Sequence, residues 1–522
     1  MLTITKIKLH NFKRFRDLTL DLNPDMNIFV GDNESGKSTI LQAIDLVARG
    51  SRTRVENIGL DKLFNVEAIN SFIESNRDLN YLPDMYVELY FTDQTNPFIE
   101  GENNSLQHTY SGIKLHCELN DEYSQHVVQL LQDSNAPFPF EFFKIVFETF
   151  AGEPFNAYTK ILKNLFIDNS LIGSPYAMRE YVNDIYHSQL SDLQRLNAKH
   201  AYKESKVQFQ NQSLAQYNAS IAPYSFAIRD SVDENIETDI TLHENGVPLE
   251  NKGMGTQCFI KTELSLNRAV NGIDIVLIEE PENHLSYMKM LKLVELIRGA
   301  DDRQLFISTH SNLIATRLNL KRCFLFNSSS ENIVSLSALT KDTADFFMKA
   351  PDNNMLQFVL SKKSILVEGD AEFILMEAFY NRTVNKDLFK SGIGVIAVDG
   401  KCFKRYLEIA KVLENKVAVI TDNDKDYDEN IKNNYFEYTQ NQFPNIRIFA
   451  DSDNARYTFE VCLYSDNKPA CDSQFQTPRR KLDTLEYMIK NKAEAAYILL
   501  KNRADMLVVP QYIQYAIRWI DD

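Results

Sequence analysis

Residues 31–39, GDNESGKST, have the composition and spacing of a loop that binds nucleotide phosphates. Gly31, Gly36, Lys37 and Ser38 fit the pattern GxxxxGK followed by Ser or Thr. In such a loop, backbone N–H groups surround the phosphates, the lysine reaches the β- and γ-phosphates, and the hydroxyl binds Mg²⁺. The pattern therefore predicts ATP and Mg²⁺ as ligands. The expected nucleotide-binding residues are Gly31, Asn33, Gly36, Lys37, Ser38 and Thr39.

Two acidic residues that follow a later apolar run, IVLI at 275–278, are the expected partners of this loop. Glu279 lies where a carboxylate can hold Mg²⁺, and Glu280 can orient the water that attacks the phosphate. Another apolar run, at 305–308, leads to His310, which can sense the γ-phosphate. A histidine alone is more often structural. Its place after this second strand favours the functional interpretation.

A further group of acids lies in the C-terminal third of the chain. Glu368 follows the apolar run SILV, Glu372 comes one helical turn later, and Asp422 and Asp424 follow the run VAVIT. Sites in parallel sheets form at the carboxyl ends of strands, where four acids would repel one another without cations. Such oxygen ligands suit Mg²⁺ or Mn²⁺. A solvated acidic turn is the alternative for 422–428, and the presence of Glu368 favours the metal site.

Length, charge and cysteine content limit the class of protein. A chain of 522 residues is longer than a single hydrophobic core usually supports, so we expect more than one domain. The net charge of −16 argues against a general polyanion-coating protein, although a local basic stripe can still bind DNA. The six cysteines show no CxxC pair, so neither a disulfide framework nor a zinc site is expected. Without a signal peptide or a membrane-length apolar run, we expect a cytoplasmic protein.

The pattern of apolar residues predicts the elements that position these groups. Alternation at 18–22 and short apolar runs at 28–30 and 86–91 indicate strands, and residues 38–49 have helical spacing. Residues 151–235 are polar and indicate a mostly helical insertion, either a cap or a dimerisation arm. Strand–helix alternation then resumes. After a polar linker, three β-rich runs predict a second, smaller parallel sheet: 364–367, 395–398 and 417–420.

The motifs around the nucleotide loop resemble those of ABC-type ATPases, in the branch close to chromosome-maintenance proteins. LIEEPENHLS resembles the Walker B strand and D-loop, FISTHS the H-loop, and IKLHNFKRFRDLTLDL the first strands. NKGMGTQ is the candidate signature motif, with Gly253 and Gly255, although Asn251 and Lys252 stand where a serine is usual. The resemblance implies at least a homodimer, in which each signature motif closes over the partner's phosphate loop.

A glutamate followed by DxD on successive strands resembles the TOPRIM pattern of topoisomerases, primases and certain nucleases. No cysteine spacing supports the zinc module of primases, and few residues remain for the extra domains of topoisomerases. Glu460 in YTFEVCL and Lys492 in KNKAEAAYIL match nucleases. An ABC-type ATPase followed by TOPRIM is the order of the Old (overcoming lysogenization defect) family, which this chain resembles over nearly its whole length.

The resemblance assigns roles to individual residues. One or two divalent metals would be held by Glu368, Glu372, Asp422, Asp424 and Glu460, in addition to the ATP-site metal held by Ser38 and Glu279. Lys492 would neutralise charge in the transition state, although it also fits an ordinary solvated lysine. The expected catalytic residues are Glu280, His310, Glu368, Asp422 and Lys492.

The resulting expectation is an α/β protein: an ABC-type ATPase head with a helical insertion, followed by a TOPRIM domain with a parallel sheet. The expected parts are 1–150 and 236–345 for the ATPase, 151–235 for the insertion, 346–362 for the linker and 363–522 for TOPRIM. Family members cut DNA in bacterial phage defence, with a helicase-like partner or a reverse transcriptase and its small DNA. The alternatives are a DNA-repair or chromosome-organising ATPase that does not cut, and a TOPRIM strand-passing enzyme.

Overall fold

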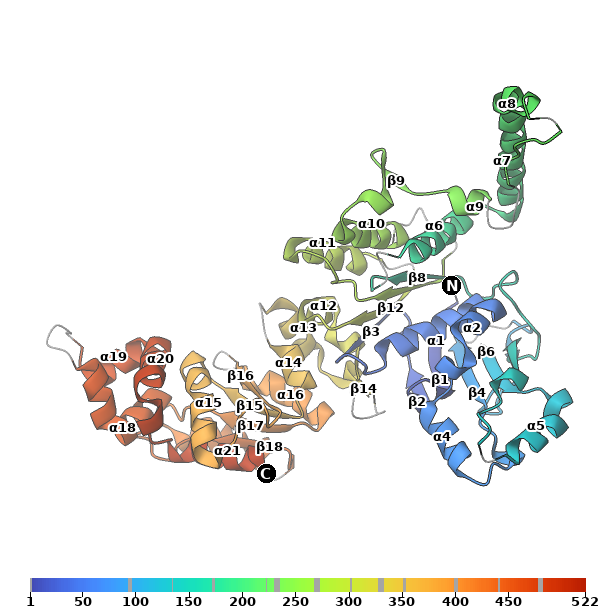
Figure 1. Cartoon of the computed structure of the whole chain (residues 1–522). Helices are drawn as coiled ribbons and strands as arrows, with labels where there is room; N and C mark the ends of the chain where they lie inside the picture. The colour runs from blue at the N-terminus through green and yellow to red at the C-terminus, as the bar shows by residue number, and fades with distance from the viewer. Residues whose placement is uncertain are drawn as a thin grey trace. The chain divides into compact units, whose positions relative to one another are not determined.

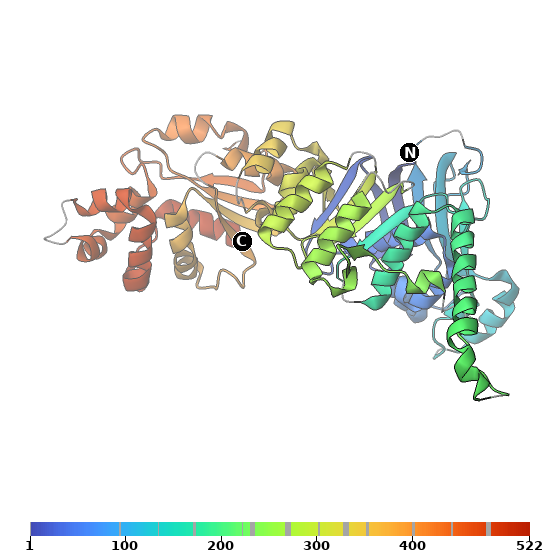
Figure 2. The same ribbon diagram turned by 90° about the horizontal axis from the view of Figure 1, so that it is seen from above.

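The structure is a computed structural model, and the part described here divides into two compact units. The first comprises residues 1–310 and 326–333, and the second residues 311–325 and 334–522. The described residues are 2–92, 96–133, 135–170, 174–221, 223–229, 235–266, 273–300, 303–326, 333–350, 354–398, 402–439, 442–476 and 482–522. Figure 1 and Figure 2 show the elements in two views.

An antiparallel sheet opens the first unit, with the order β2-β1-β4-β6-β5 and β7 paired to β6. Apolar side chains alternate along its strands, so that one face packs into the core, as at Ile7 and Leu9 of β1. The strands are β1 (Ile4–Phe12), β2 (Phe15–Asp21), β4 (Met85–Phe91), β5 (Glu100–Gly101), β6 (Tyr110–Leu119) and β7 (Phe143–Thr149).

A second sheet carries the phosphate loop. Parallel strands run in the order β3-β12-β11-β8, and β13 and β14 extend the sheet beyond β3. Nearly every residue of these central strands is buried, which is the pattern of a sheet covered on both faces. The strands are β3 (Met26–Gly31), β8 (Asn164–Asp168), β11 (Ile275–Glu279), β12 (Gln304–Thr309), β13 (Cys323–Phe326) and β14 (Val334–Ser335).

Helices of the first unit include α1 (Lys37–Arg49), which follows the phosphate loop, and the helices of the insertion. The predicted insertion is mostly helical, but it also contains β8, which pairs with β11. None of the residues of α7 is buried, and α7 and α8 extend away from the sheets of their unit (Figure 1). The other helices and short strands are α2 (Arg52–Ile58), α3 (Leu60–Leu63), α4 (Val66–Glu74), α5 (Ser124–Leu131), α6 (Pro175–Gln189), α7 (Asp192–Ser213), α8 (Ala215–Ala219), α9 (Ile236–Asp239), β9 (His243–Glu244), β10 (Val247–Pro248), α10 (Met254–Leu266) and α11 (Tyr287–Arg298).

The second unit contains a parallel sheet of order β16-β15-β17-β18. Its strands are β15 (Lys363–Val367), β16 (Ile393–Ala397), β17 (Lys416–Ile420) and β18 (Ile446–Phe449), the last of which was not predicted. Three helices that lie before or within the predicted linker also belong to this unit. They are α12 (Asn312–Leu318), α13 (Lys341–Lys349) and α14 (Met355–Leu360). The others are α15 (Asp370–Val384), α16 (Phe403–Leu413), α17 (Phe436–Thr439), α18 (Phe459–Phe475), α19 (Thr484–Lys490), α20 (Lys492–Arg503) and α21 (Gln511–Asp521).

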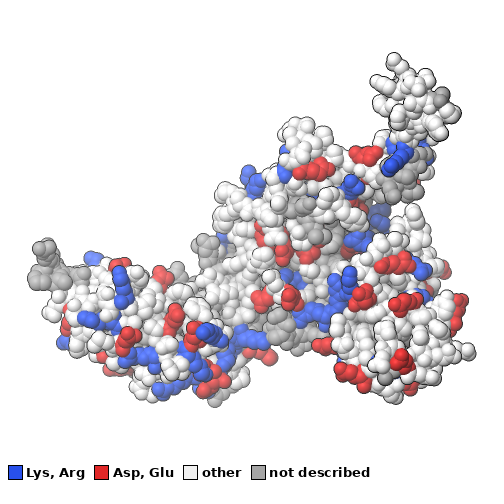
Figure 3. All heavy atoms as spheres, viewed as in Figure 1, with Lys and Arg blue, Asp and Glu red and all other residues white. Residues whose placement is uncertain are grey.

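These elements confirm the predicted α/β class and the parallel sheet near the C-terminus. Within the described ranges, no helix is both long and apolar enough to cross a membrane. All six cysteines are free thiols. On the face shown in Figure 3, Lys and Arg side chains are interspersed with Asp and Glu over both units.

Candidate nucleotide and metal sites

The phosphate loop joins β3 to α1, and its backbone requires both glycines. A side-chain carbon at Gly31 would lie 2.4 Å from the backbone oxygen of Phe326. Gly36 caps the N-terminus of α1 with a φ of 102°, a conformation that residues with a side chain disfavour. The loop therefore ends at the positive end of the helix dipole, where phosphate binds.

Lys37 is held inside this loop. Its Nζ donates hydrogen bonds to the backbone oxygens of Gly31 and Asp32, each 2.7 Å away, and only 5% of the residue is exposed. Burial lowers the pKa of Lys37, and the carboxylates of Glu280 and Asp32 oppose that shift. The ammonium therefore lies where phosphate oxygens can replace the two carbonyl oxygens as its partners.

Ser38 and Glu279 meet as the two expected Mg²⁺ ligands of the ATP site. Glu279 ends β11, and the Ser38 side chain lies near enough to lower the pKa of its carboxyl. Burial raises the pKa of Glu279, and the charges of Asp168 and Glu280 add to the effect. A hydroxyl near a partly buried carboxylate fits the oxygen-ligand preference of Mg²⁺.

Glu280 and His310 face each other beyond the ends of β11 and β12. Parallel pairing of Glu279 with Ser308 puts both strand ends at one edge of the sheet. His310 Nδ1 lies 3.7 Å from Glu280 Oε1 and 3.3 Å from Glu282 Oε1. The sequence analysis gave Glu282 no role. In the structure it accepts hydrogen bonds from the Thr309 hydroxyl and the His310 N–H, so it fixes the backbone that carries His310.

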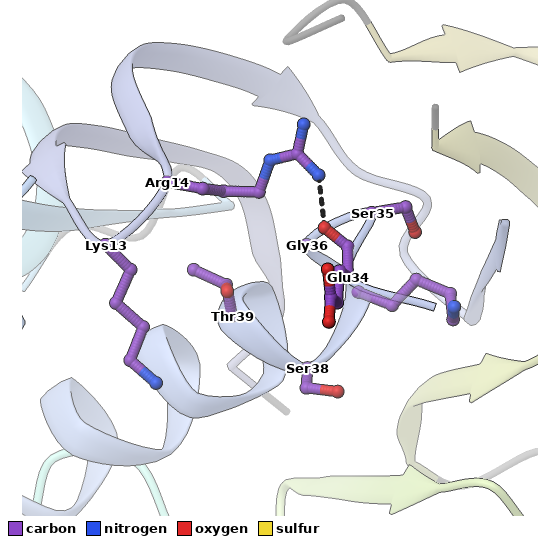
Figure 4. A pocket seen from close by; sticks show the side chains of 8 residues that line it. Lys13, Arg14, Glu34, Ser35, Gly36, Ser38 and Thr39 are labelled. Atoms are coloured by element: carbon purple, nitrogen blue, oxygen red, sulfur yellow. Dashed lines mark hydrogen bonds between the residues drawn. The ribbon is translucent and has the colours of Figure 1, made fainter. Parts of the chain in front are cut away.

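A pocket of about 220 Å³ lies over the phosphate loop (Figure 4). Two of its lining residues, Lys13 and Arg14, come from the turn between β1 and β2 and were not predicted. Arg14 donates a hydrogen bond of 2.5 Å to the backbone oxygen of Glu34. Two adjacent cations in NFKRF, between expected strands, were the available signal. The lining residues are Lys13, Arg14, Glu34, Ser35, Gly36, Lys37, Ser38 and Thr39.

The candidate signature residues lie apart from this pocket. Gly253 and Gly255 stand at the start of α10, and neither lines the pocket over the phosphate loop. A side-chain carbon at Gly255 would lie 2.1 Å from the backbone oxygen of His284, so this glycine allows close packing within its own chain. Their predicted role, closing over another subunit's nucleotide, stays a prediction.

In the second unit, the sheet brings Glu368 and Asp422 to one edge. Val367, the last residue of β15, pairs with Ile420, the last residue of β17. Glu368 Oε2 lies 3.4 Å from both the Thr421 hydroxyl and the Asp422 N–H, which donate to it. The two carboxylates therefore emerge from neighbouring strand ends, as the parallel-sheet argument predicts.

Helices α15, α18 and α20 bring three more charged groups to this edge. Glu372 and Glu460 lie in the first turns of α15 and α18, and are 6% and 3% exposed. Lys492 begins α20, and its Nζ lies 3.5 Å from Glu460 Oε1. The Phe459 N–H donates a 2.8 Å hydrogen bond to Asp422 Oδ1 and ties α18 to β17.

The charges of this carboxylate cluster, Glu368, Glu372, Asp422 and Glu460, are not balanced by the chain. Burial, followed by repulsion from Glu368, Glu372 and Glu460, raises the pKa of Asp422 to about 8. Burial and the charges of Glu460 and Glu368 raise that of Glu372 to about 7. Lys492 opposes both shifts, and the surrounding acids raise the pKa of Lys492 against the effect of burial.

The donor atoms of the cluster fit a divalent cation. All are carboxylate oxygens, and Glu460 Oε2, which is buried, has no hydrogen-bond partner among the described residues. As they stand, no three described His, Cys, Asp or Glu side chains gather closely enough to hold one ion. Asp424 is exposed with a φ of 48°, and its role as a ligand stays a prediction.

Comparison with known families defines the class: an ATPase domain joined to a TOPRIM nuclease domain. Residues 2–315, more than half of the chain, match the family model described as AAA ATPase domain, and the chain belongs to this family. Residues 359–424 match the model described as "Overcoming lysogenization defect protein-like, TOPRIM domain". The second match includes Glu368, Glu372 and Asp422.

Curated relatives match over short stretches only. The chain is 46% identical over 52 residues to the DNA replication and repair protein RecF of Lactococcus lactis subsp. cremoris (strain MG1363), covering 10% of this chain and 14% of that protein. The RecF of Colwellia psychrerythraea (strain 34H / ATCC BAA-681) is 31% identical over 81 residues, covering 16% of this chain and 21% of that protein. The chain thus spans about a fifth or less of these relatives.

Solved structures match this chain at low similarity. The SMC head domain from Thermotoga maritima has a TM-score of 0.30 at 14% identity and covers 62% of this chain and 94% of its own. The C-terminal region of the Xanthomonas campestris pv. campestris OLD protein has a TM-score of 0.24 at 22% identity, covering 31% and 95%. Scores this low carry no further conclusion.

Proposed function

We propose that the protein is an ATP-regulated, divalent-metal-dependent DNA endonuclease that cuts phosphodiester bonds at the TOPRIM carboxylates. One observation carries the proposal: four carboxylates converge at a single sheet edge with one lysine, in a chain that also has a phosphate loop. Burying several acids together is unfavourable unless cations join them, and metal-assisted phosphodiester cleavage uses such a cluster.

At the nuclease site, Glu368, Glu372, Asp422 and Glu460 would hold one or two Mg²⁺ or Mn²⁺ ions. Such ions polarise the phosphate and lower the pKa of bound water. Because burial and neighbouring acids raise the pKa values of Glu372 and Asp422, a bound cation would displace protons from them. Lys492, 3.5 Å from Glu460, neutralises charge that builds on the phosphate.

At the ATP site, Lys37 would bind the β- and γ-phosphates, and Ser38 and Glu279 would hold a Mg²⁺ ion that neutralises phosphate charge. Glu280 orients the attacking water, and His310 contacts the γ-phosphate. Gly31, Asn33, Gly36 and Thr39 complete the nucleotide-binding loop, whose N–H groups surround the phosphates.

The active assembly would be a homodimer or a higher homo-oligomer, with Gly253 and Gly255 of one chain closing over the phosphate loop of another. The position of these glycines away from the pocket of their own chain supports this arrangement. Light scattering tests it, because a single chain of 60.2 kDa both with and without ATP would contradict shared sites.

The biological setting follows from the family resemblance. We propose a cytoplasmic role in bacterial antiphage defence, with a helicase-like protein or a reverse transcriptase and its small DNA as partner. The OLD-like TOPRIM match supports this setting. A phage challenge of cells that carry the gene with and without its genomic neighbours tests it, and unchanged plaque counts would contradict the role.

Plasmid cleavage tests the central proposal. Pure protein is incubated with supercoiled plasmid, with Mg²⁺ or Mn²⁺, and with or without ATP. We expect nicked or linear DNA that depends on metal and responds to ATP. Relaxed circles without nicks would instead indicate a strand-passing enzyme.

A DNA-repair or chromosome-organising ATPase that binds DNA without cutting is the second candidate. The short RecF-like stretch favours it, since RecF is described as a replication and repair protein. DNA binding together with no cleavage in any divalent metal would support this candidate over the nuclease.

A further inference from the structure

Asn423, between Asp422 and Asp424, lies at the centre of a hydrogen-bond network that no motif predicts. It directly precedes the turn after β17, and only 1% of its surface is exposed. Its Nδ2 donates to the backbone oxygens of Asp451, Asp453 and Arg456, at 2.8, 3.0 and 3.4 Å. The side-chain amide thus connects the loop after β17 to the segment that follows β18.

This second segment leads directly into the metal cluster. Residues 451–457 join β18 to α18, whose first turn carries Glu460. The backbone oxygen of Tyr457 accepts a 3.2 Å hydrogen bond from the Asp424 N–H. Two residues later, the Phe459 N–H donates to Asp422 Oδ1. The position of Glu460 relative to Asp422 therefore depends on how segment 451–457 is held.

The chemistry of the position requires an amide. Oδ1 of Asn423 accepts a 2.9 Å hydrogen bond from the Lys425 N–H, while Nδ2 faces three carbonyl oxygens. Aspartate has nearly the same shape, but it would place an acceptor against those oxygens. The oxygen of Asp451 would lose its donor, whereas those of Asp453 and Arg456 keep the Arg456 N–H and the Cys462 thiol. Acceptors that face one another without a hydrogen between them are unfavourable, so the segment would move rather than remain in place.

We propose that Asn423 is the positioning residue that sets the separation between Asp422 and Glu460 for a shared divalent cation. This inference rests on the proposed nuclease function, since it concerns the same cluster. Outer partners of metal ligands orient the ligands, and their loss typically weakens metal affinity by about 10- to 100-fold. Asn423 acts in this way through the backbone of segment 451–457 and not by touching the metal.

Direct Mn²⁺ binding to the full chain, followed by electron paramagnetic resonance without nucleotide or DNA, tests the inference. All proteins compared in this experiment also carry Ser38→Ala, which removes the hydroxyl expected to bind metal at the ATP site. We expect Asn423→Asp to weaken Mn²⁺ binding by roughly 10- to 100-fold. At a higher Mn²⁺ concentration, the variant should bind as many ions per chain as the parent. If Mn²⁺ binding recovers at a high Mn²⁺ concentration, the ligands are displaced but the domain is still folded.

Asn445→Asp is the matched control. Its Nδ2 also donates to two backbone oxygens, those of Ala410 and Asn415, at 3.3 and 2.9 Å, before the first residue of β18. We expect this change to leave Mn²⁺ affinity within about two-fold of the parent, because it lies at the strand end opposite the ligands. Equal weakening by Asn423→Asp and Asn445→Asp would overturn the inference in favour of general destabilisation.

Two further variants distinguish failure of the positioning role from failure of the proposed metal site. Asn423→Ser keeps a donor without adding charge, and it replaces Asn423→Asp if that variant does not fold. Parent-like Mn²⁺ affinity in a folded Asn423 variant overturns the positioning role alone. A parent protein whose Mn²⁺ binding is unchanged by Glu368→Ala overturns the proposed metal site, and the inference with it.

Discussion

The two sites of this chain use charge in opposite ways. In the ATP site, the buried cation Lys37 has two carbonyl oxygens at 2.7 Å and lies near Glu279 and Glu280. In the TOPRIM site, Glu372 and Asp422 lie close to other acids, and Lys492 is the cation that opposes their pKa shifts. The first site holds a lysine among its acids at the phosphate loop, whereas in the second the acids outnumber the lysine beside them.

This difference explains which site is shaped in advance. Lys37 is already held in the loop by two backbone oxygens, which phosphate oxygens can replace. In the carboxylate cluster, burial and like charges raise the pKa values of Glu372 and Asp422 and so favour their protonated forms. Metal binding by the proposed site would therefore compete with protons.

The largest expected effect is loss of cleavage in Glu368→Ala and Asp422→Ala. Each change removes a carboxylate from a neighbouring strand end, so plasmid cleavage should fall by several orders of magnitude as metal is lost. ATP hydrolysis should continue, because its residues lie in the other unit. Cleavage is followed on supercoiled plasmid in Mg²⁺ and Mn²⁺, and ATP hydrolysis by phosphate release.

Asp428→Ala is the control for this pair. Asp428 lies in the same acidic run but pairs with Lys432 on the surface, at 2.6 Å. It should cut DNA at the parent rate. Parent-rate cleavage by Glu368→Ala would remove TOPRIM as the cutting site and favour the DNA-binding ATPase.

The next effect concerns the ATP site and leaves the carboxylate cluster intact. Glu280→Gln should keep nucleotide binding but lower hydrolysis roughly 100- to 10,000-fold, since the attacking water loses its base. Lys37→Ala should weaken nucleotide binding itself, because the phosphates lose a charge. Binding is measured with a fluorescent ATP analogue, and exposed Glu295→Gln on α11 serves as control. Hydrolysis at the parent rate in Glu280→Gln would show that another group orients the water.

The sequence predicts the strands of both sites because their apolar patterns are strong. Glu368 and Asp422 could be placed together because parallel strands end at one edge. Glu460 and Lys492 came from the family resemblance alone, since neither follows a strand. Periodicity gives no information on the path of a chain between elements.

Contacts between distant segments were the part that could not be predicted. Lys13 and Arg14 enter the phosphate pocket only because the β1–β2 turn folds over α1. Asn423 looks like a spacer in DxD, yet it is buried against residues 451–456. Helices α12 and α13 group with the second unit, and the ATPase bounds of 236–345 stay a prediction. Each outcome depends on tertiary packing that local pattern does not encode.

A smaller effect on DNA cleavage is expected from changing Lys492, the positively charged side chain beside the carboxylate cluster. Lys492→Gln should lower cleavage by roughly 100-fold, because one charge that stabilises the transition state is lost. Lys490→Gln, at the end of the preceding helix, is the matched control and should cut normally. Equal rates for both variants would identify Lys492 as an ordinary solvated lysine.

The smallest effect is a pH dependence of stability in metal-free protein. In the unfolded chain, the Asp422 and Glu372 carboxyls titrate near pH ~4, whereas in the folded chain their pKa values are about 8 and about 7. The folded state therefore binds more protons between these limits. Its free energy of unfolding should fall as pH rises from about 4 to about 8.

The fluorescence of Trp519, the only tryptophan in the sequence, allows unfolding of the second unit to be followed separately. It lies on α21 and packs against Phe449, with ring centroids 6.0 Å apart, so its fluorescence reports unfolding of the unit that holds the cluster. In EDTA, the melting temperature from this signal should drop between pH 5 and pH 8, and Asp422→Asn should flatten the slope by removing one titrating group. Added Mg²⁺ should flatten it as well, because the cation takes the place of the protons. A slope of the opposite sign in the parent would show that the four carboxylates do not repel one another, and that the two sites do not differ in charge balance.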